Sequence, residues 1–309
     1  MTLCLVTGGA GFIGSHLVEA LVEHNKCVRV LDDFSTGRRE NLAAVADQIE
    51  LLEGDVTDSE TVEQAVAGCD YVLHLAAIAS VQASLEKPQT SHRVNVDGTL
   101  NVLDAARRVG VQRFVIASST AVYGDHTALP LREELAPRPL SPYAATKAAG
   151  EAYCSAFHTS YGLPTVALRF FNVYGPRQDP SNPYSGVISI FAARVARGEH
   201  PVIYGDGKQT RDFVYVADVI RAILLACERE AAAGNVFNVG GGRQTSVLQL
   251  VTALNQALDT ALKPTFAPAR SGEVRFSQAN VSRARKVMGW KPQVTLQEGL
   301  SKLVRAEYK

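Results

Sequence analysis

The feature that most constrains the fold is a glycine-rich segment, TGGAGFIG, at residues 7–14. Its spaced glycines, Gly8, Gly11 and Gly14, follow a short apolar run and precede a helical pattern that includes Phe12 and Ile13. Glycine allows a tight turn and close approach of the backbone to a pyrophosphate, and a helix N-terminus offers free N–H groups and a partial positive charge. The segment therefore predicts a dinucleotide cradle, with a plain glycine turn as the alternative.

A carboxylate follows at the spacing that such a cradle requires. Asp32 ends the next apolar run, eighteen residues after Gly14, close to the ~20-residue offset at which an acidic residue hydrogen-bonds the adenosine ribose. Its charge would repel a 2′-phosphate, which favours NAD over NADP, whereas Arg38 and Arg39 act in the opposite direction. The alternative is that Asp32 is a solvated turn residue. We also assign Asp33 to the cofactor site, with the same alternative.

A second carboxylate leaves two readings open. Asp55 lies in the EGDV turn after the third apolar run, followed by Val56. It is positioned either to meet the adenine amino group or to cap the helix that follows. We include both residues in the predicted cofactor site.

Short apolar runs alternate with helical patterns over the first 168 residues. The runs lie at 3–7, 27–31, 49–52, 71–75, 114–117 and 165–168, and the helical patterns at 12–24, 59–66, 94–109 and 143–161. This alternation predicts a doubly wound, parallel-sheet α/β domain of the Rossmann type at residues 1–168. Beyond it the rhythm breaks, so residues 169–309 are expected to form mainly a smaller C-terminal α/β substrate domain, with segments near 213–239 returning to the first.

Charge and cysteine content exclude several function classes. Thirty-one basic residues balance thirty-one acidic ones, so nothing favours nucleic acid or a membrane surface as a partner. No apolar stretch reaches the ~18 residues of a membrane span. The five cysteines are scattered and form no C-x-x-C pair, which predicts buried thiols in a cytoplasmic protein without a metal site.

A tyrosine–lysine pair indicates the chemistry. Tyr143 and Lys147 are four residues apart on one face of a predicted helix. Removing a hydroxyl proton near neutral pH requires the phenol pKa to fall by ~3 units, or ~4 kcal/mol, which a neighbouring ammonium and a nicotinamide cation can supply. This spacing also arises by chance on surface helices, so the surrounding sequence has to distinguish a catalytic pair from a chance one.

Serines supply that context. The run at 114–117 ends in Ser118 and Ser119, and a hydroxyl at the carboxyl edge of a parallel sheet faces the ligand crevice. Ser119 is therefore assigned to bond the oxygen that Tyr143 deprotonates. Ser118 either caps its own strand end or touches the cofactor.

With these residues in place, the chain resembles the extended short-chain dehydrogenase/reductase family, and within it the nucleotide-sugar 4-epimerases. The resemblance covers nearly the whole chain. It rests on TGGAGFIG, HLAA at His74, the Asn95 segment, SSTAVYG at Ser118, SPYAATK at Ser141, LRFFNVYGP at Leu168, GDGKQTRDFVYV at Gly205 and the Gly289-Trp290 pair.

The resemblance implies further site residues. Asn172, Arg211 and Arg270 match substrate contacts to the diphosphate and uridine, a role that suits the planar fork of arginine; otherwise each arginine would be an exposed surface charge. Cofactor-lining positions are matched by Leu75, Ala76, Ala77, Asn95 and Phe170, although Phe170 is equally suited to the core.

The resemblance also bears on the reaction. Related dehydratases and decarboxylases carry an acidic residue beside the V-Y-G triplet, where this chain has Thr120 and Ala121. We therefore expect reversible oxidation at C4 of a UDP-hexose, interconverting UDP-glucose and UDP-galactose. The alternatives are a UDP-glucuronate 4-epimerase, another nucleotide-sugar oxidoreductase or dehydratase, and a non-catalytic NAD- or nucleotide-sugar-binding module.

Two positions refine this expectation. Ser277 matches a site where a large residue restricts epimerases to plain hexoses, so a small one is expected to admit UDP-N-acetylglucosamine and UDP-N-acetylgalactosamine. Ala79 departs from the family pattern, which has a lysine near the nicotinamide diphosphate. The resemblance further implies a homodimer formed through the helices after Val94 and Tyr143.

Overall fold

The computed structural model describes residues 2–180, 186–269 and 274–308. Its largest element is a parallel sheet of seven strands in the order β11-β6-β5-β4-β1-β2-β3. These strands are β1 (Leu3–Thr7), β2 (Cys27–Asp32), β3 (Ile49–Glu53), β4 (Tyr71–His74), β5 (Arg113–Ser119), β6 (Thr165–Phe170) and β11 (Asn235–Val239). The order confirms the predicted Rossmann-type fold, because the chain runs from β1 to β3 and then crosses back to β4 beside β1.

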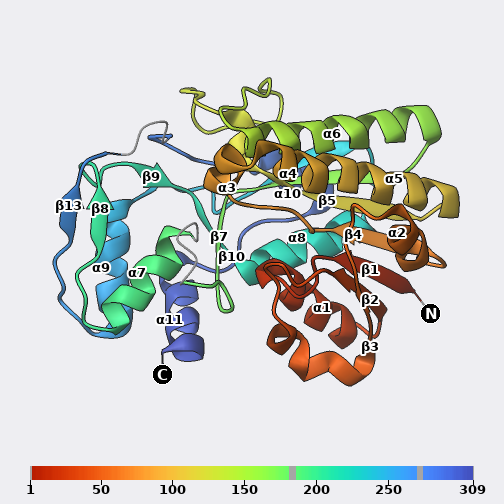
Figure 1. Cartoon of the computed structure of the whole chain (residues 1–309). Helices are drawn as coiled ribbons and strands as arrows, with labels where there is room; N and C mark the ends of the chain where they lie inside the picture. The colour runs from red at the N-terminus through yellow and green to blue at the C-terminus, as the bar shows by residue number, and fades with distance from the viewer. Residues whose placement is uncertain (1, 181–185, 270–273, 309) are drawn as a thin grey trace.

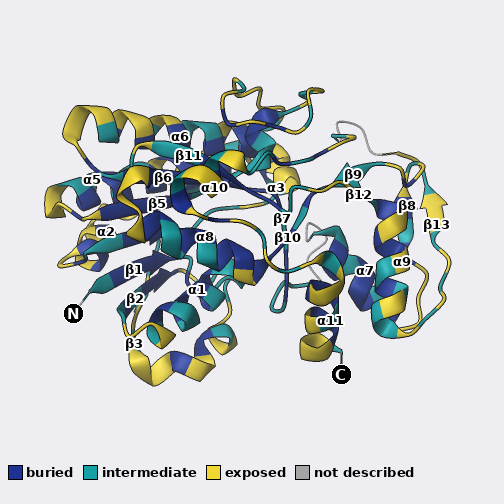
Figure 2. Cartoon of the chain, turned by 180° about the vertical axis from the view of Figure 1, so that it is seen from behind, coloured by how far each residue is buried: buried dark blue, intermediate teal, exposed yellow. Residues whose placement is uncertain are grey.

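Helices cover both faces of the sheet because its strands are apolar on both sides. Helices α1 (Phe12–Glu23) and α8 (Val216–Glu228) pack on the face that contains Cys4 and Val6. The other face contains Leu5 and is covered by α2 (Ser59–Val66), α5 (Gly98–Val109) and α6 (Pro142–Tyr161). Figure 1 shows these layers, and Figure 2 shows buried residues concentrated in the strands and exposed ones on the outer helix turns.

The other strands form separate pairs in the second half of the chain. They are β7 (Asn172–Tyr174) with β10 (Phe213–Tyr215), β9 (Thr210–Arg211) with β12 (Thr245–Ser246), and β8 (Val202–Tyr204) with β13 (Thr265–Ala267). Helices α7 (Val187–Ala196), α9 (Val247–Leu258) and α11 (Leu296–Glu307) pack beside them. In Figure 1, β8, β13, α7 and α9 lie at the opposite end of the molecule from β1–β3. Strand β11 nevertheless returns to the main sheet, beside β6.

The shorter helices differ most from the sequence-based expectation. Helices α3 (Val81–Glu86), α4 (Pro88–His92) and α10 (Ser282–Met288) were not predicted. The helix expected over residues 94–109 instead begins with a π-helical segment, Arg93–Asp97, before α5. None of the five cysteines forms a disulfide, and four of them are buried. Among the described residues, no helix is long and apolar enough to cross a membrane.

Candidate active site

The glycine segment forms the turn from β1 into α1, at the point where the strand order reverses between β1 and β4. Gly8 has a φ of +69°, and a Cβ there would lie 2.7 Å from the Ala76 main-chain nitrogen. A Cβ on Gly14 would lie 2.1 Å from the Gly8 carbonyl oxygen. Only glycine therefore keeps the space beside the N-terminus of α1 that a pyrophosphate needs.

Asp32 ends β2 close to this turn and is only 6% exposed. Its Oδ2 accepts a hydrogen bond from Ala10 N at 2.8 Å, and its Oδ1 accepts one from Phe34 N at 2.9 Å. Burial raises the pKa of Asp32, and these hydrogen bonds oppose that rise. The fixed carboxylate fits a ribose hydroxyl. Asp33, by contrast, is exposed and bonds Ser35 locally, which is the turn role that had been its alternative.

The two arginines that weighed against NAD are engaged elsewhere. Arg38 forms an ion pair with Asp179, and Arg39 forms one with Glu53. The Arg39 guanidinium also lies 4.0 Å from the centroid of the Phe34 ring. These contacts favour NAD over a cofactor with a 2′-phosphate.

The structure decides one reading of Asp55. The N-cap of α2 is Asp58, whose side chain accepts from Glu60 N. Asp55 instead accepts from Thr57 N at 2.8 Å, so the helix-cap alternative was wrong. The Val56 side chain is buried in the core, which leaves only its main chain to meet a cofactor.

The loop after β4 closes the opposite side of the cradle. Ala76 N donates to Thr7 Oγ1 at 3.2 Å. Asn95 is 3% exposed, and its Oδ1 accepts from Ile78 N at 2.8 Å. Its Nδ2 donates to Ile78 O at 3.1 Å and to Thr146 Oγ1 at 3.0 Å. Asn95 therefore shapes the loop and ties it to α6. The loop carries three predicted cofactor-lining residues: Leu75, Ala76 and Ala77.

A buried histidine at the end of β4 connects β1 with the first turn of α5. His74 Nδ1 lies 2.8 Å from Thr7 Oγ1, and His74 Nε2 lies 2.9 Å from Thr99 Oγ1. Because the Thr99 hydroxyl donates to Asn95 O at 2.7 Å, it accepts from His74, which places the proton on Nε2. Burial lowers the pKa of His74 to about 3, so the ring is neutral.

The catalytic residues predicted from the sequence lie together at the carboxyl end of β5. Tyr143 and Lys147 are each 8% exposed near the start of α6, and Lys147 Nζ lies 5.9 Å from the Tyr143 ring centroid. The Ser119 side chain lies close enough to the Tyr143 phenol to lower its pKa. Lys147 Nζ donates to Ala117 O at 2.9 Å, which fixes the ammonium against the strand end.

The protein environment alone does not ionise the phenol. Burial raises the pKa of Tyr143 above its ordinary value, and the Ser119 hydrogen bond only opposes this rise. Burial lowers the pKa of Lys147 to about 8, against an opposing effect of Glu151. Proton abstraction therefore requires phenolate stabilisation beyond that of the Ser119 side chain.

Two predicted cofactor residues have other main contacts. The Ser118 hydroxyl donates to Glu151 rather than to its own strand end, and its contact with the cofactor stays a prediction. Phe170 is 7% exposed and belongs to the hydrophobic core, the role that had been its alternative. Phe12 and Ile13, by comparison, are only partly buried at the start of α1.

Two of the predicted substrate residues lie on short strands. Asn172 starts β7, and Arg211 ends β9 with its Nη1 donating to Thr210 O at 2.9 Å. Ser277 is 5% exposed, and its buried hydroxyl has no hydrogen-bond partner among the described residues. Arg270 lies outside the described residues. The described residues contain no group of three or more His, Cys, Asp or Glu arranged for a metal ion.

Sequence reasoning missed several residues that support the site. Ser84 Oγ accepts from Tyr143 N at 3.0 Å, and Thr146 Oγ1 donates to Tyr143 O at 2.8 Å. Glu151 and Arg169 form a buried ion pair behind Lys147. Only Glu151 carried a sequence signal: an acidic residue four positions after Lys147, on a helix face expected to be buried.

Comparisons with known proteins identify the family of this chain. A model described as "NAD dependent epimerase/dehydratase family" matches residues 4–240. A UDP-glucose 4-epimerase of Mycolicibacterium smegmatis is 43% identical over 304 residues, covering 97% of this chain and 96% of that one.

Two solved structures extend the similarity to the fold. The UDP-glucose 4-epimerase of Thermotoga maritima with UDP-glucose has a TM-score of 0.95 at 41% identity, covering 99% of this chain and 98% of that one. A UDP-N-acetylglucosamine 4-epimerase of Methanobrevibacter ruminantium has a TM-score of 0.95 at 37% identity, covering 99% and 97%. With the family model spanning most of the sequence and relatives aligned over nearly all of it, the chain belongs to the NAD-dependent epimerase/dehydratase family.

Proposed function

We propose that this protein is a 4-epimerase that interconverts UDP-glucose and UDP-galactose through a transient 4-keto sugar. The observation that carries the proposal is the buried Tyr143 phenol beside Ser119, with the Lys147 ammonium held behind it at the end of β5. The relatives named UDP-glucose 4-epimerase support the same reaction. Thr120 and Ala121, which follow Ser119 directly, offer no carboxyl group for elimination chemistry.

The chain's own residues handle binding and proton transfer. Tyr143 takes the proton of the 4-hydroxyl while the Ser119 hydroxyl holds the same sugar oxygen. Lys147, kept in place by Ala117 O, stabilises the phenolate. NAD, held by the glycine turn and Asp32, supplies the acceptor and then the donor of the C4 hydride. After the keto sugar has turned over, Tyr143 returns the proton to give the C4 epimer.

The test is product analysis with isotopes. Purified protein is incubated with NAD and UDP-glucose deuterated at C4, and in parallel with unlabelled UDP-glucose in D₂O. Epimerisation predicts UDP-galactose that keeps its C4 deuterium in the first case and gains none from solvent in the second. A 4-keto-6-deoxy product, decarboxylation of UDP-glucuronate, or no turnover of any UDP-sugar would reject the assignment. UDP-glucuronate is included to test the uronate alternative.

We also propose that the enzyme accepts 2-acetamido sugars. The small side chain of Ser277 supports this, because its buried hydroxyl has no partner within the described residues. The similar UDP-N-acetylglucosamine 4-epimerase from Methanobrevibacter ruminantium supports it as well. Turnover of UDP-galactose without any turnover of UDP-N-acetylgalactosamine would exclude the wider range.

A homodimer remains part of the proposal. Helix α6 borders two grooves, one shared with α4 and lined by residues such as Pro88, Ala145 and Ala149, the other shared with α5 and including Tyr153 and Tyr161. A second copy packing its own α5 and α6 against this surface would bury both grooves. Light scattering of the purified chain should give twice the monomer mass, and Ala149→Arg should give the monomer mass.

A further inference from the structure

Helix α6 presents three ionisable residues to the sheet on a single buried face. Tyr143, Lys147 and Glu151 follow each other at intervals of four residues, and each is less than 9% exposed. The first two belong to the proposed catalytic centre, whereas Glu151 lies one helical turn deeper. A buried carboxylate costs free energy unless it is paired, so its partner is informative.

That partner is Arg169 on β6. Its Nε donates to Glu151 Oε1 at 2.9 Å and its Nη2 donates to Oε2 at 2.7 Å, a two-point contact between nearly inaccessible side chains. Glu151 Oε1 also accepts from Ser118 Oγ. Because Ser118 and Arg169 are direct neighbours in the β5–β6 ladder, the carboxylate holds both strands against α6.

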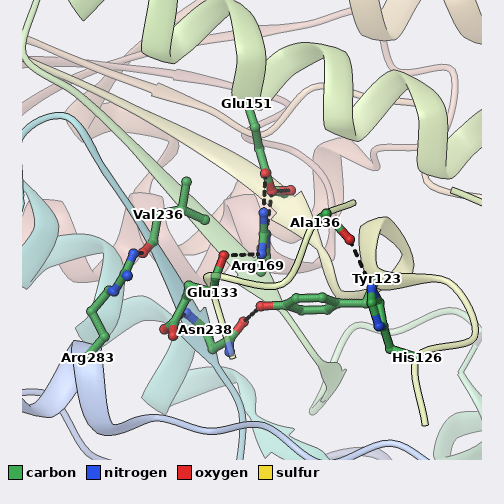
Figure 3. Close-up of polar contacts among 10 residues, drawn as sticks. Tyr123, His126, Glu133, Ala136, Glu151, Arg169, Val236, Asn238 and Arg283 are labelled. Atoms are coloured by element: carbon green, nitrogen blue, oxygen red, sulfur yellow. Dashed lines mark hydrogen bonds and ion pairs between the residues drawn. The ribbon is translucent and has the colours of Figure 1, made fainter. Parts of the chain in front are cut away.

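Arg169 is itself fixed from other parts of the fold. Its Nη1 donates to Glu133 O at 3.3 Å, and its guanidinium lies 4.6 Å from the Tyr123 ring centroid. The Tyr123 hydroxyl donates to Asn238 Oδ1 at 2.6 Å, and Asn238 N donates to Glu133 Oε1 at 2.9 Å. Figure 3 shows Glu151 reaching from its helix to Arg169, with Tyr123, Asn238 and Glu133 around the guanidinium.

We infer that Glu151 and Arg169 form a buried positioning pair that sets the charge and place of the Lys147 ammonium and of the strand end carrying Ser119. The main chain links the two effects: Ala117 accepts from Lys147, Ser118 donates to Glu151, and Ser119 lies beside the phenol. Neither Glu151 nor Arg169 acts on the reacting atoms. The inference rests on the proposed function only for its effect on turnover.

The two charges of the pair have opposite effects on Lys147. The Glu151 carboxylate favours the charged ammonium, which burial disfavours. Arg169 occupies both carboxylate oxygens, so the carboxylate balances part of the desolvation cost without drawing Lys147 away from Ala117. With the pair intact, the buried cluster keeps one net positive charge, opposite the phenolate that Tyr143 forms.

Few other charges act on this cluster. Among the described residues, the titratable groups around it lie on three parts of the fold. They are His74 on β4, Tyr123 and Glu133 between β5 and α6, and Tyr143 and Cys154 on α6. Burial raises the pKa of Tyr123 to about 12, and His74 is neutral. On the outer side of α6, His92 of α4 and Asp97 before α5 are exposed and paired with each other.

The test measures the titration of Lys147 directly. The full chain with NAD is labelled with lysine carrying ¹³C at Cε, and the Lys147 signal is assigned by its loss in Lys147→Arg. Glu151→Gln should lower the pKa of Lys147 by about 1 unit, and Arg169→Met should raise it by a similar amount. Glu151→Gln combined with Arg169→Met should return it close to the wild-type value. Arg108→Met, which breaks an exposed ion pair with Glu63 and Asp104, should leave it unchanged.

Opposite shifts distinguish positioning from simple packing. A structural role alone predicts lower melting temperatures without a change in the Lys147 titration, and shifts of the same sign in both single variants would also overturn the inference. If Arg169→Met does not fold, the pKa of Lys147 in Glu151→Gln tests the inference by itself, because the amide keeps the shape of the carboxylate. In turnover, Glu151→Gln should move the alkaline limb of the pH profile to lower pH. The titration needs no substrate, so its outcome stands even if the 4-epimerase assignment fails.

Discussion

Two regions of this molecule present the predicted ligand-binding residues in different ways. In one region, the glycine turn, Asp32 and Ser119 lie at the ends of strands in one continuous parallel sheet. In the other region, the predicted substrate residues Asn172 and Arg211 lie on strands of three and two residues outside that sheet. The positions of the predicted cofactor residues follow from the regular order of the parallel strands. The positions of the predicted substrate residues depend instead on contacts between segments far apart in the sequence.

The largest expected effect comes from disturbing the cofactor side. In Gly14→Ala the new methyl group would meet the Gly8 carbonyl oxygen at 2.1 Å and the Gly9 Cα at 2.8 Å, both of them backbone atoms. Overpacking of this kind costs about 2–3 kcal/mol, so NAD affinity should fall by about 30- to 150-fold. Isothermal titration calorimetry should show this loss while UDP still binds as in the wild type.

A control glycine sharpens that comparison. Gly162 ends α6 with a φ of +70°, and a Cβ there has no heavy atom within 4 Å. Gly162→Ala should therefore cost about 1 kcal/mol of stability through backbone strain and leave NAD binding unchanged. Equal loss of NAD affinity in both variants would show that the turn is not specific for the cofactor.

A smaller effect is expected from the buried histidine of the same side. The folded-state pKa of His74, about 3, lies below its unfolded value of 6.5, so the unfolded chain binds more protons between these two values. Stability therefore falls as the pH drops through this window, by about 2 kcal/mol between about pH 7.5 and about pH 5. Urea unfolding of His74→Gln, whose amide can replace both ring hydrogen bonds, should show a pH dependence weaker by this amount. An identical slope in both proteins would contradict the neutral, buried ring.

The smallest effect is expected at the substrate side. In Ser277→Tyr, a large side chain replaces the buried serine next to Thr210. Turnover of UDP-N-acetylgalactosamine should fall about 10-fold relative to UDP-galactose, with NAD binding unchanged. A variant that loses both sugars equally would indicate a folding defect rather than selection.

Much of the cofactor side could be predicted from the sequence because its signals are local. The glycine spacing, the carboxylate after β2 and the four-residue interval from Tyr143 to Lys147 each lie within or next to one element, and the structure brings them to one edge of the sheet. The carboxyl ends of parallel strands lie at one edge of the sheet, so strand ends that are far apart in sequence become neighbours.

Other features could not be predicted because they depend on side-chain choices across the fold. Nothing local distinguishes Asp55 from Asp58 as the cap of α2, since either carboxylate can reach an early N–H group. Ser118 bonds Glu151, thirty-three residues away, rather than its own strand end. The pairing of Arg169 with that carboxylate depends on the β5–β6 register, which no residue pattern specifies.

The most direct test of the account compares two tyrosines of the same helix. Tyr143 is buried in the proposed centre, and Tyr161 is 59% exposed at the far end of α6. Tyr143→Phe should reduce the interconversion of UDP-glucose and UDP-galactose by at least about 10³-fold with NAD still bound, while Tyr161→Phe keeps wild-type turnover. Wild-type turnover in Tyr143→Phe would contradict the central claim that this phenol moves the proton.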